Sequence, residues 1–184
     1  MNIIETGLSG LLIIEPKVFG DERGYFYESY NKSTFDNLGL EFNFVQDNQS
    51  QSFKNVLRGL HYQIEPYAQA KLVRVFKGKV LDVAVDIRKG SSTYGKWHGV
   101  VLSESNKRQL LIPRGFAHGF VVLSESAEFF YKCDNYYSKD HEGGIRFDDP
   151  DLAIDWQIDR SKAILSDKDE ALPLLNEAIN NFTI

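Results

Sequence analysis

The feature of this sequence that most constrains its fold is a series of short strand-like segments separated by turn residues. The segments are rich in β-branched and aromatic residues, and several alternate between apolar and polar positions, as half-buried β-strands do. Strands are predicted at residues 8–16, 25–30, 42–51, 71–76, 80–87, 98–102, 108–112, 119–123 and 127–137, with a further strand and loop within residues 55–71. Such a series of short, regularly spaced strands predicts a mainly β protein, built as a sandwich, jelly roll or barrel.

Two segments depart from this pattern and are predicted to be helical. Residues 31–38 begin with residues suited to an N-cap and precede Gly39. Residues 168–181 begin with acidic residues and carry apolar residues at helical spacing, so we expect a short C-terminal helix that starts or bends at Pro173. Because no repeat, low-complexity stretch or linker interrupts the chain, residues 1–184 are predicted to form a single domain.

Composition and charge narrow the class of protein further. The net charge is −5 at neutral pH, which argues against general nucleic-acid binding and against attachment to a membrane surface. The single cysteine, Cys133, excludes an internal disulfide and fits a reducing compartment. No apolar run approaches the roughly 20 residues that a membrane span needs, and the short run at residues 11–14 has no basic leader. We therefore expect a cytoplasmic protein.

Residues 55–71 concentrate polar side chains in the setting of a strand. Arg58, His61 and Lys71 are interleaved there with apolar residues. Burying a neutral polar group without a partner costs about 2–7 kcal/mol, and burying a charge costs more. Strict alternation would place Arg58 and His61 on opposite faces of a strand. Gly59 lies between them, and we predict a β-bulge there that brings both side chains to the same face.

Two motifs resemble the paired motifs of the cupin superfamily, whose members are small antiparallel jelly-roll barrels with a site in the barrel mouth. They are GLHYQ at residues 59–63 and PRGFAH at residues 113–118. Metal-binding cupins use two histidines and a glutamate from the first motif and one histidine from the second. Here Gln63 replaces a histidine, and Lys71, whose ammonium cannot accept a metal bond, lies near the carboxylate position. Two histidines are too few for a stable site, so we expect no metal.

Over nearly the whole chain, the sequence resembles the dTDP-4-dehydrorhamnose 3,5-epimerase family of cupins. Six markers occur in order: EPKVFGDERG (15–24), FVQDN (44–48), LRGLH (57–61), VAVDIR (83–88), IPRGFAHGF (112–120) and LSDKD (165–169). The resemblance implies an isomerase without a cofactor that inverts C3 and C5 of dTDP-4-dehydro-6-deoxy-D-glucose. The product would be dTDP-4-dehydro-L-rhamnose, a precursor of cell-surface polysaccharide.

The resemblance also implies roles for individual residues. His61 would be the base, paired with Asp169, and Tyr131 would be the acid on the opposite face of the sugar. Lys71 would stabilise the developing enolate. The implied substrate-binding residues are Arg23, Phe26, Glu28, Gln46, Asn48, Arg58, His118, Tyr136 and Lys168.

The resemblance further implies a homodimer that exchanges N-terminal strands. Arg23, Phe26 and Glu28 would then serve the site of the neighbouring subunit, and Phe26 and Tyr136 would flank the thymine of the bound sugar nucleotide.

This set of residues matches the chemistry of inversion beside a ketone. The C4 ketone acidifies the hydrogens on C3 and C5, so each inversion needs a base, an enolate stabiliser and an acid on the other face. A histidine with a free pKa of about 6.5 suits the base, a carboxylate fixes its tautomer, and a lysine supplies positive charge. As a further hypothesis, Asp82, on the strand after Lys71, pairs with that lysine.

Other functions stay open at this point. A related epimerase that inverts C3 alone would use the same base and acid. A 3,4-ketoisomerase of the same barrel is disfavoured because the full base–acid set is present, and a non-catalytic sugar-nucleotide-binding cupin is disfavoured for the same reason. A metal-dependent cupin oxygenase is disfavoured by Gln63 and Lys71.

Overall fold

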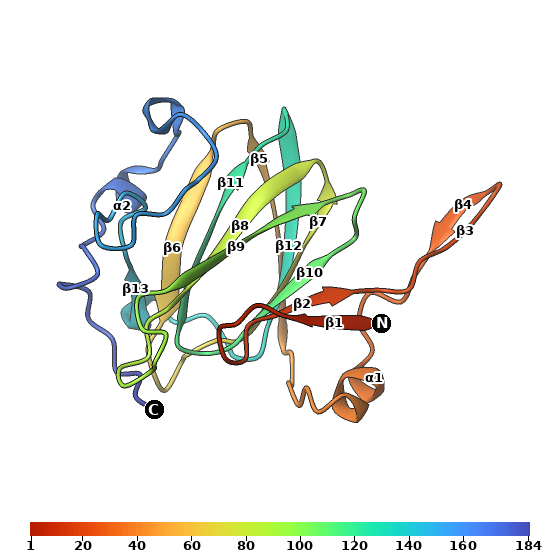
Figure 1. Cartoon of the computed structure of the whole chain (residues 1–184), viewed down its shortest axis with the longest axis horizontal. Coiled ribbons are helices and arrows are strands. Elements are labelled where there is room, and N and C mark those ends of the chain that lie inside the picture. The colour runs from red at the N-terminus through yellow and green to blue at the C-terminus, as the bar shows by residue number, and fades with distance from the viewer.

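Two antiparallel β-sheets face each other in the computed structural model, which describes residues 1–184, and a thin arm projects from one side (Figure 1). The larger sheet has the strand order β1-β2-β10-β7-β12-β5, the smaller sheet has the order β13-β6-β11-β8-β9, and the arm is the hairpin β3-β4. This architecture confirms the predicted mainly β fold, a cupin-type antiparallel jelly-roll barrel with short helices.

The elements have the following bounds. The larger sheet contains β1 (Asn2–Glu5), β2 (Leu12–Glu15), β5 (Gln46–Phe53), β7 (Lys71–Lys77), β10 (Gln109–Ile112) and β12 (Ser126–Cys133). The smaller sheet contains β6 (Leu57–Gln63), β8 (Lys79–Asp86), β9 (Trp97–Ser103), β11 (Phe116–Val122) and β13 (Glu142–Gly144). The arm consists of β3 (Phe19–Asp21) and β4 (Gly24–Phe26), and the helices are α1 (Lys32–Asn37), α2 (Asp167–Glu170) and the 3₁₀ turns η1 (Lys139–His141) and η2 (Arg160–Lys162). None of the helices is long and apolar enough to cross a membrane.

The core has two main layers because β8 and β11 are buried on both faces. Val80 and Ala84 of β8 point into the barrel between the sheets, and Leu81 and Val83 point the other way. The second layer is covered by the irregular C-terminal part of the chain, residues 145–182. Burial on both faces explains why this part of the sequence is almost continuously apolar instead of alternating.

Several predicted strands have different limits in the structure. Residues 8–16 form a strand only at Leu12–Glu15, and the strand predicted at 25–30 ends at Phe26. The strand predicted at 127–137 ends at Cys133. The largest correction concerns residues 42–51, whose polar half, not its apolar start, forms β5. The polar sequence of β5 resembles a loop because every second side chain faces a cavity between the sheets and not an apolar core.

The helix predicted at 31–38 is confirmed, whereas the predicted C-terminal helix is mostly wrong. Asn31 caps α1 by accepting a hydrogen bond from the Thr34 backbone N–H. Only Asp167–Glu170 is helical in the region predicted as 168–181. Beyond it, Leu175 and Phe182 pack onto the smaller sheet in irregular backbone, so apolar spacing there reflects separate contacts with the sheet and not one face of a helix.

The predicted bulge in β6 is confirmed. His118 of β11 lies opposite His61, and Phe120 lies opposite Arg58, so β6 carries one residue more than its partner. A Cβ on Gly59 would lie 2.6 Å from the Cα of Gly119 and 2.7 Å from the backbone oxygen of His118. Gly59 also has a φ of +115°, which L side chains rarely adopt. Glycine is therefore required where the two strands make their closest approach.

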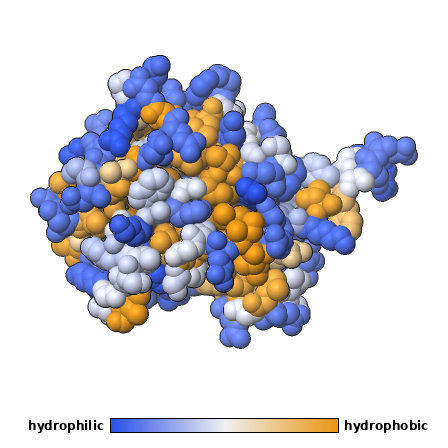
Figure 2. Space-filling model, viewed as in Figure 1, coloured by the Kyte–Doolittle hydropathy of each residue, from blue (hydrophilic) through white to orange (hydrophobic).

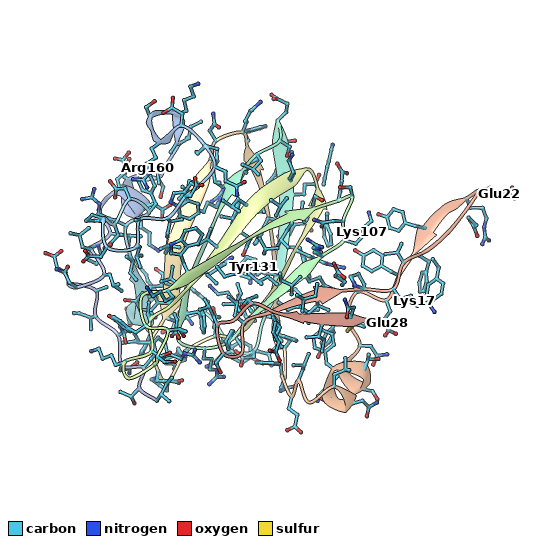
Figure 3. The ribbon with its side chains drawn as sticks, viewed as in Figure 1. Lys17, Glu22, Glu28, Lys107, Tyr131 and Arg160 are labelled. Atoms are coloured by element: carbon cyan, nitrogen blue, oxygen red, sulfur yellow. The ribbon has the colours of Figure 1, made fainter.

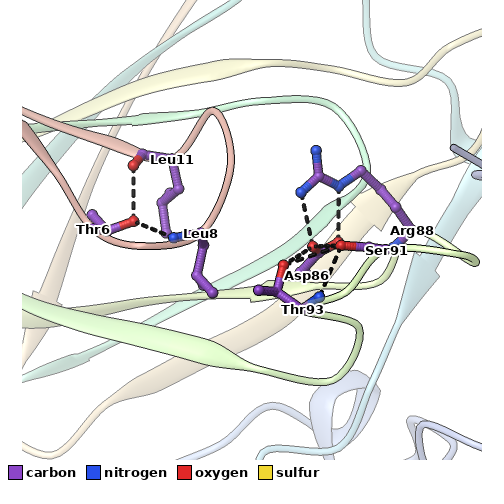
Figure 4. Close-up of polar contacts among 7 residues, drawn as sticks. All are labelled: Thr6, Leu8, Leu11, Asp86, Arg88, Ser91 and Thr93. Carbon is purple, nitrogen blue, oxygen red and sulfur yellow. Dashed lines mark hydrogen bonds and ion pairs between the residues drawn. The ribbon is translucent and has the colours of Figure 1, made fainter.

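Hydrogen bonds to the Asp86 side chain stabilise the turn after β8 (Figure 4). Its buried carboxylate accepts hydrogen bonds from Arg88 Nε (2.9 Å) and Nη2 (2.8 Å), Ser91 Oγ (2.6 Å) and Thr93 Oγ1 (2.7 Å). Burial alone would raise the pKa of Asp86, but these donors outweigh it and lower the pKa to about 2. The charged form is therefore the form that the fold stabilises.

We expect Asp86→Asn to lower the free energy of unfolding by about 2–3 kcal/mol at pH 7, since an amide cannot replace the charged acceptor. The folded pKa lies below the unfolded value of about 3.9, so this stabilisation is complete above about pH 5 and disappears as the pH falls toward 2. Urea unfolding between pH 7 and pH 3 should show the gap between wild type and variant narrowing. Asp36→Asn, which breaks an exposed pair with Lys32, is the control and should cost less than about 1 kcal/mol.

Candidate active site

A cavity of about 600 Å³ opens between the two sheets. Its walls come from β5, β6, β7, β11 and β12, and the segment around α2 closes one side. Eight of the predicted site residues line it: His61, Lys71, Tyr131, Asp169, Asn48, Arg58, His118 and Lys168. A smaller adjoining cavity of about 280 Å³ shares some of these residues and adds Gln46. Residues from six separate segments of the sequence thus meet in one place.

His61 and Asp169 form a close pair. His61 Nε2, on β6, lies 2.5 Å from Asp169 Oδ1, on α2. Burial would raise the pKa of Asp169, but hydrogen bonds from His61, from the Ser166 hydroxyl and from the Gly59 backbone hold it below its usual value. Asp169 therefore stays charged at neutral pH and can orient the imidazole and stabilise its protonated form.

Lys71, the first residue of β7, faces the cavity without an ion-pair partner. No carboxylate lies within 4.0 Å of its ammonium nitrogen. Burial lowers the pKa of Lys71, and the nearby Cys133, Asp82 and Glu142 oppose that shift. An unpaired ammonium that faces a cavity is well suited to meet an oxygen on which negative charge develops.

The hypothesis that Asp82 pairs directly with Lys71 is wrong. Both oxygens of the fully buried Asp82 carboxylate lie 3.0 Å from His118 Nε2 instead. Asp82 on β8 and His118 on β11 belong to neighbouring strands of the smaller sheet, whereas Lys71 comes from the facing sheet. Asp82 therefore fixes the His118 ring and acts on Lys71 only through longer-range attraction.

Tyr131 lies inside the barrel, on β12 between Asn48 of β5 and Val73 of β7 (Figure 3). Tyr131 shares an inward face of β12 with Phe129 and Cys133, both of which are buried. Burial raises the pKa of the Tyr131 phenol. The hydroxyl therefore keeps its proton at neutral pH, in the form that an acid needs.

Several other polar side chains that line the two cavities form hydrogen bonds or ion pairs with neighbouring residues. Arg58 Nε donates to Ser52 Oγ at 3.0 Å, and Gln46 Nε2 donates to Asn48 Oδ1 at 3.1 Å. Lys168 Nζ lies 2.6 Å from a carboxylate oxygen of Glu142. Arg58, Lys71 and Lys168 bring three cationic groups to one cavity, which gives a protein of net negative charge a local site for an anion.

Four predicted site residues lie away from the cavity. Arg23 is at the tip of the arm, ion-paired with Asp21, and Phe26 on the arm is 71% exposed. Glu28 lies at the base of the arm, where it accepts a hydrogen bond from Asn31 Nδ2. Tyr136 is exposed on the loop after β12. Within one chain, therefore, the arm does not complete the site.

Sequence reasoning missed several residues that line the cavity. Phe120 and Phe129 stack with ring centroids 4.2 Å apart and form an apolar wall. Ser166 borders the cavity beside Asp169; a serine three residues before an acidic residue is a helix-start signal that pointed to it. Ser50 gave no signal, because its place in β5 becomes clear only from the strand register. No three His, Cys, Asp or Glu side chains gather as a group that could hold a metal ion.

Comparisons with known proteins agree with this geometry. The sequence model for dTDP-4-dehydrorhamnose 3,5-epimerase matches residues 5–177. An enzyme of that name from Shigella flexneri is 60% identical over 170 residues, which cover 92% of this chain and 93% of the relative.

Two solved structures have the same fold and more than half of their aligned residues in common with this chain. The dTDP-4-dehydrorhamnose 3,5-epimerase from Elizabethkingia anophelis superposes with a TM-score of 0.93 at 56% identity, covering 96% of this chain and 97% of the other. The dTDP-6-deoxy-D-glucose-3,5-epimerase from Legionella pneumophila, solved with dTDP-4-keto-L-rhamnose, gives a TM-score of 0.92 at 56% identity, with 96% and 93% covered. The chain is thus an isomerase, and it belongs to the dTDP-4-dehydrorhamnose 3,5-epimerase family.

Proposed function

We propose that this cavity inverts C3 and C5 of dTDP-4-dehydro-6-deoxy-D-glucose and releases dTDP-4-dehydro-L-rhamnose. The observation that carries the proposal is the meeting of three groups in one cavity: the His61–Asp169 pair, the Tyr131 phenol and the unpaired Lys71 ammonium. They supply a base, an acid and a cation, which are the three functions that inversion beside a ketone requires.

The reaction proceeds by proton transfer alone. His61 removes the proton from the carbon next to the C4 ketone, and Asp169 stabilises the imidazolium that forms. The electrons of the broken C–H bond move onto the ketone oxygen, and the Lys71 ammonium stabilises the negative charge of the resulting enolate. Burial lowers the pKa of Lys71. The enolate charge raises that pKa again, so the ammonium keeps its proton while the enolate is present. Tyr131 then donates its proton to the carbon from the opposite face. The same groups serve C3 and C5 in turn.

The remaining polar residues hold the rest of the substrate. Arg58 and Lys168 are placed to bind the diphosphate, because guanidinium and ammonium groups suit phosphate oxygens. Asn48, Gln46 and His118 hold the sugar hydroxyls and the ketone. A phosphate group would compete with Glu142 for Lys168, so we expect this exposed ion pair to rearrange on binding. As part of the proposal, the enzyme works in the cytoplasm, where Cys133 remains a free thiol.

We infer that a homodimer completes the site by exchanging the arms. The arm exposes Phe19, Tyr25 and Phe26 by 54%, 61% and 71%, and hydrophobic surface gathers around its base (Figure 2). On the larger sheet, Phe53 of β5 is 66% exposed. Exposed aromatic residues on a projecting segment favour a protein partner.

The edge of the larger sheet offers a place for a partner's arm. β5 is an edge strand, so one side of its backbone has no strand partner, and unpaired edges recruit strands from other chains. β5 also carries Asn48, a cavity residue. An arm from a second subunit, lying along β5, would bring Arg23, Phe26 and Glu28 to the diphosphate and the thymine. Tyr136 would face Phe26 across the base.

The proposed reaction is tested by proton NMR of dTDP-4-dehydro-6-deoxy-D-glucose incubated with the protein in D₂O. We expect loss of both the C3 and the C5 proton signals. His61→Asn should slow both exchanges by about 10²- to 10⁴-fold because the base is gone, while His98→Asn, on β9 away from the cavity, should leave them unchanged. Exchange at C3 alone would identify a C3-only epimerase. Exchange at neither carbon, with the substrate bound, would reject the epimerase proposal.

Tyr131→Phe should separate proton exchange from inversion. The variant keeps the ring but loses the acid, so His61 can still remove a proton and return a deuteron to the same face. We expect formation of the inverted product to fall by about 10²- to 10⁴-fold while exchange at C3 and C5 falls much less, as followed by NMR in D₂O. Equal losses of exchange and inversion would contradict the assignment of Tyr131 as the acid of the opposite face.

Arm exchange predicts complementation between two inactive variants. Arg23→Ala disables the arm, and His61→Asn disables the base. If the arm serves the partner's site, each mixed dimer contains one intact site, so after unfolding and refolding of an equimolar mixture about one quarter of the sites should be active. Light scattering checks that dimers form. No recovery in dimers that have mixed would show that each arm serves its own chain.

A further inference from the structure

Ser166 makes two hydrogen bonds to Asp169. Its Oγ accepts a bond from the Asp169 backbone N–H at 3.2 Å and donates to Asp169 Oδ2 at 2.9 Å. The other carboxylate oxygen, Oδ1, faces His61 Nε2 at 2.5 Å. The serine hydroxyl, the carboxylate and the imidazole therefore form one chain of contacts that ends in the cavity.

The Ser166 hydroxyl is the only side chain that donates to Oδ2, and the Gly59 backbone contributes a further hydrogen bond to the carboxylate. The last side-chain torsion of an aspartate is broad, so the orientation of the carboxylate plane depends on the donors around it. Asp169 is only 4% exposed, so bulk water has little room to replace a lost donor. A hydroxyl that donates to a charged carboxylate makes a short, strong hydrogen bond. The Ser166 hydroxyl thus fixes the orientation of the carboxylate that in turn fixes the imidazole.

We propose that Ser166 is a positioning residue for the epimerisation: through Asp169 it holds the His61 ring in the orientation from which the base reaches the substrate carbon. This inference rests on the proposed function of His61. It gives Ser166 a role distinct from capping α2, because the cap uses the serine oxygen as an acceptor and the positioning role uses its hydrogen as a donor.

Four variants separate the two roles. Ser166→Ala removes both hydrogen bonds, and Ser166→Thr keeps both. Ser166→Asp keeps a cap acceptor but cannot donate to a carboxylate at neutral pH. Asp159→Ala removes the cap that Asp159 provides to Ser161 in the 3₁₀ turn η2, at a position outside the cavity and the arm.

We expect Ser166→Ala to lower kcat about tenfold, the size of effect seen when a supporting hydrogen bond to an active-site group is removed, with KM changed less than about twofold. The variant Ser166→Thr should recover kcat to within about threefold of wild type, Ser166→Asp should be no better than Ser166→Ala, and Asp159→Ala should match wild type. Steady-state kinetics at pH 7.5, with thermal unfolding to confirm folding, gives these values. Wild-type kcat in Ser166→Ala or Ser166→Asp, or failure of Ser166→Thr to recover it, would overturn the proposal.

A second measurement does not depend on turnover. The proton between His61 Nε2 and Asp169 should give a downfield ¹H NMR signal, assigned by its loss in His61→Asn. Ser166→Ala should shift or broaden this signal, and Ser166→Thr and Asp159→Ala should leave it in place. An unchanged signal in Ser166→Ala would reject the positioning role even if the wild-type protein did not act on this sugar, whereas wild-type inactivity alone would reject the proposed function and not this inference.

Discussion

The close contact between β6 and β11 at Gly59 and Gly119 is the constraint on which the site depends. A Cβ on Gly119 would lie 2.7 Å from the Arg58 backbone oxygen, and one on Gly59 would lie 2.6 Å from the Cα of Gly119. Two glycines let the strands approach while β6 takes up one extra residue. Without that extra residue, the alternation of the strand would send Arg58 and His61 to opposite faces. The bulge therefore brings Arg58 and His61 to the same cavity.

Burial then sets the chemical state of each group in the cavity. It raises the pKa of Tyr131, which keeps the phenol protonated, and lowers the pKa of Lys71, which makes its ammonium a stronger acid. Asp169 escapes the effect of burial because donors surround its carboxylate. Asp82 has His118 as its hydrogen-bond partner, and burial raises its pKa even so. Two histidine–aspartate pairs of different character thus lie next to each other, because His118 of β11 is the strand partner of His61 of β6.

The strands that carry the site differ in sequence from the strands that carry the fold. β8 is apolar on both faces and was found from sequence with nearly its observed limits. The residues of β5 are mostly polar, because some of them face a cavity that must hold a polar ligand. The arm shows the same separation, since its exposed aromatic residues contribute nothing to the core of their own chain. Where function sets the composition, hydrophobic pattern alone is a weak guide to structure.

The sequence by itself determined the mainly β class, the helix at Asn31 and the bulge at Gly59, because alternation, capping residues and a glycine within a strand are local signals. The family resemblance also predicted His61, Lys71, Tyr131 and Asp169 as a set, and all four line one cavity. Only the tertiary structure decided that Asp82 serves His118 and not Lys71, because strand order brings β8 beside β11 and leaves β7 in the facing sheet. It also decided that the segment after Glu170 is irregular, because that segment packs against strands that are distant in the sequence. It decided that Ser166 donates to Asp169, because that bond depends on the direction of a single hydroxyl.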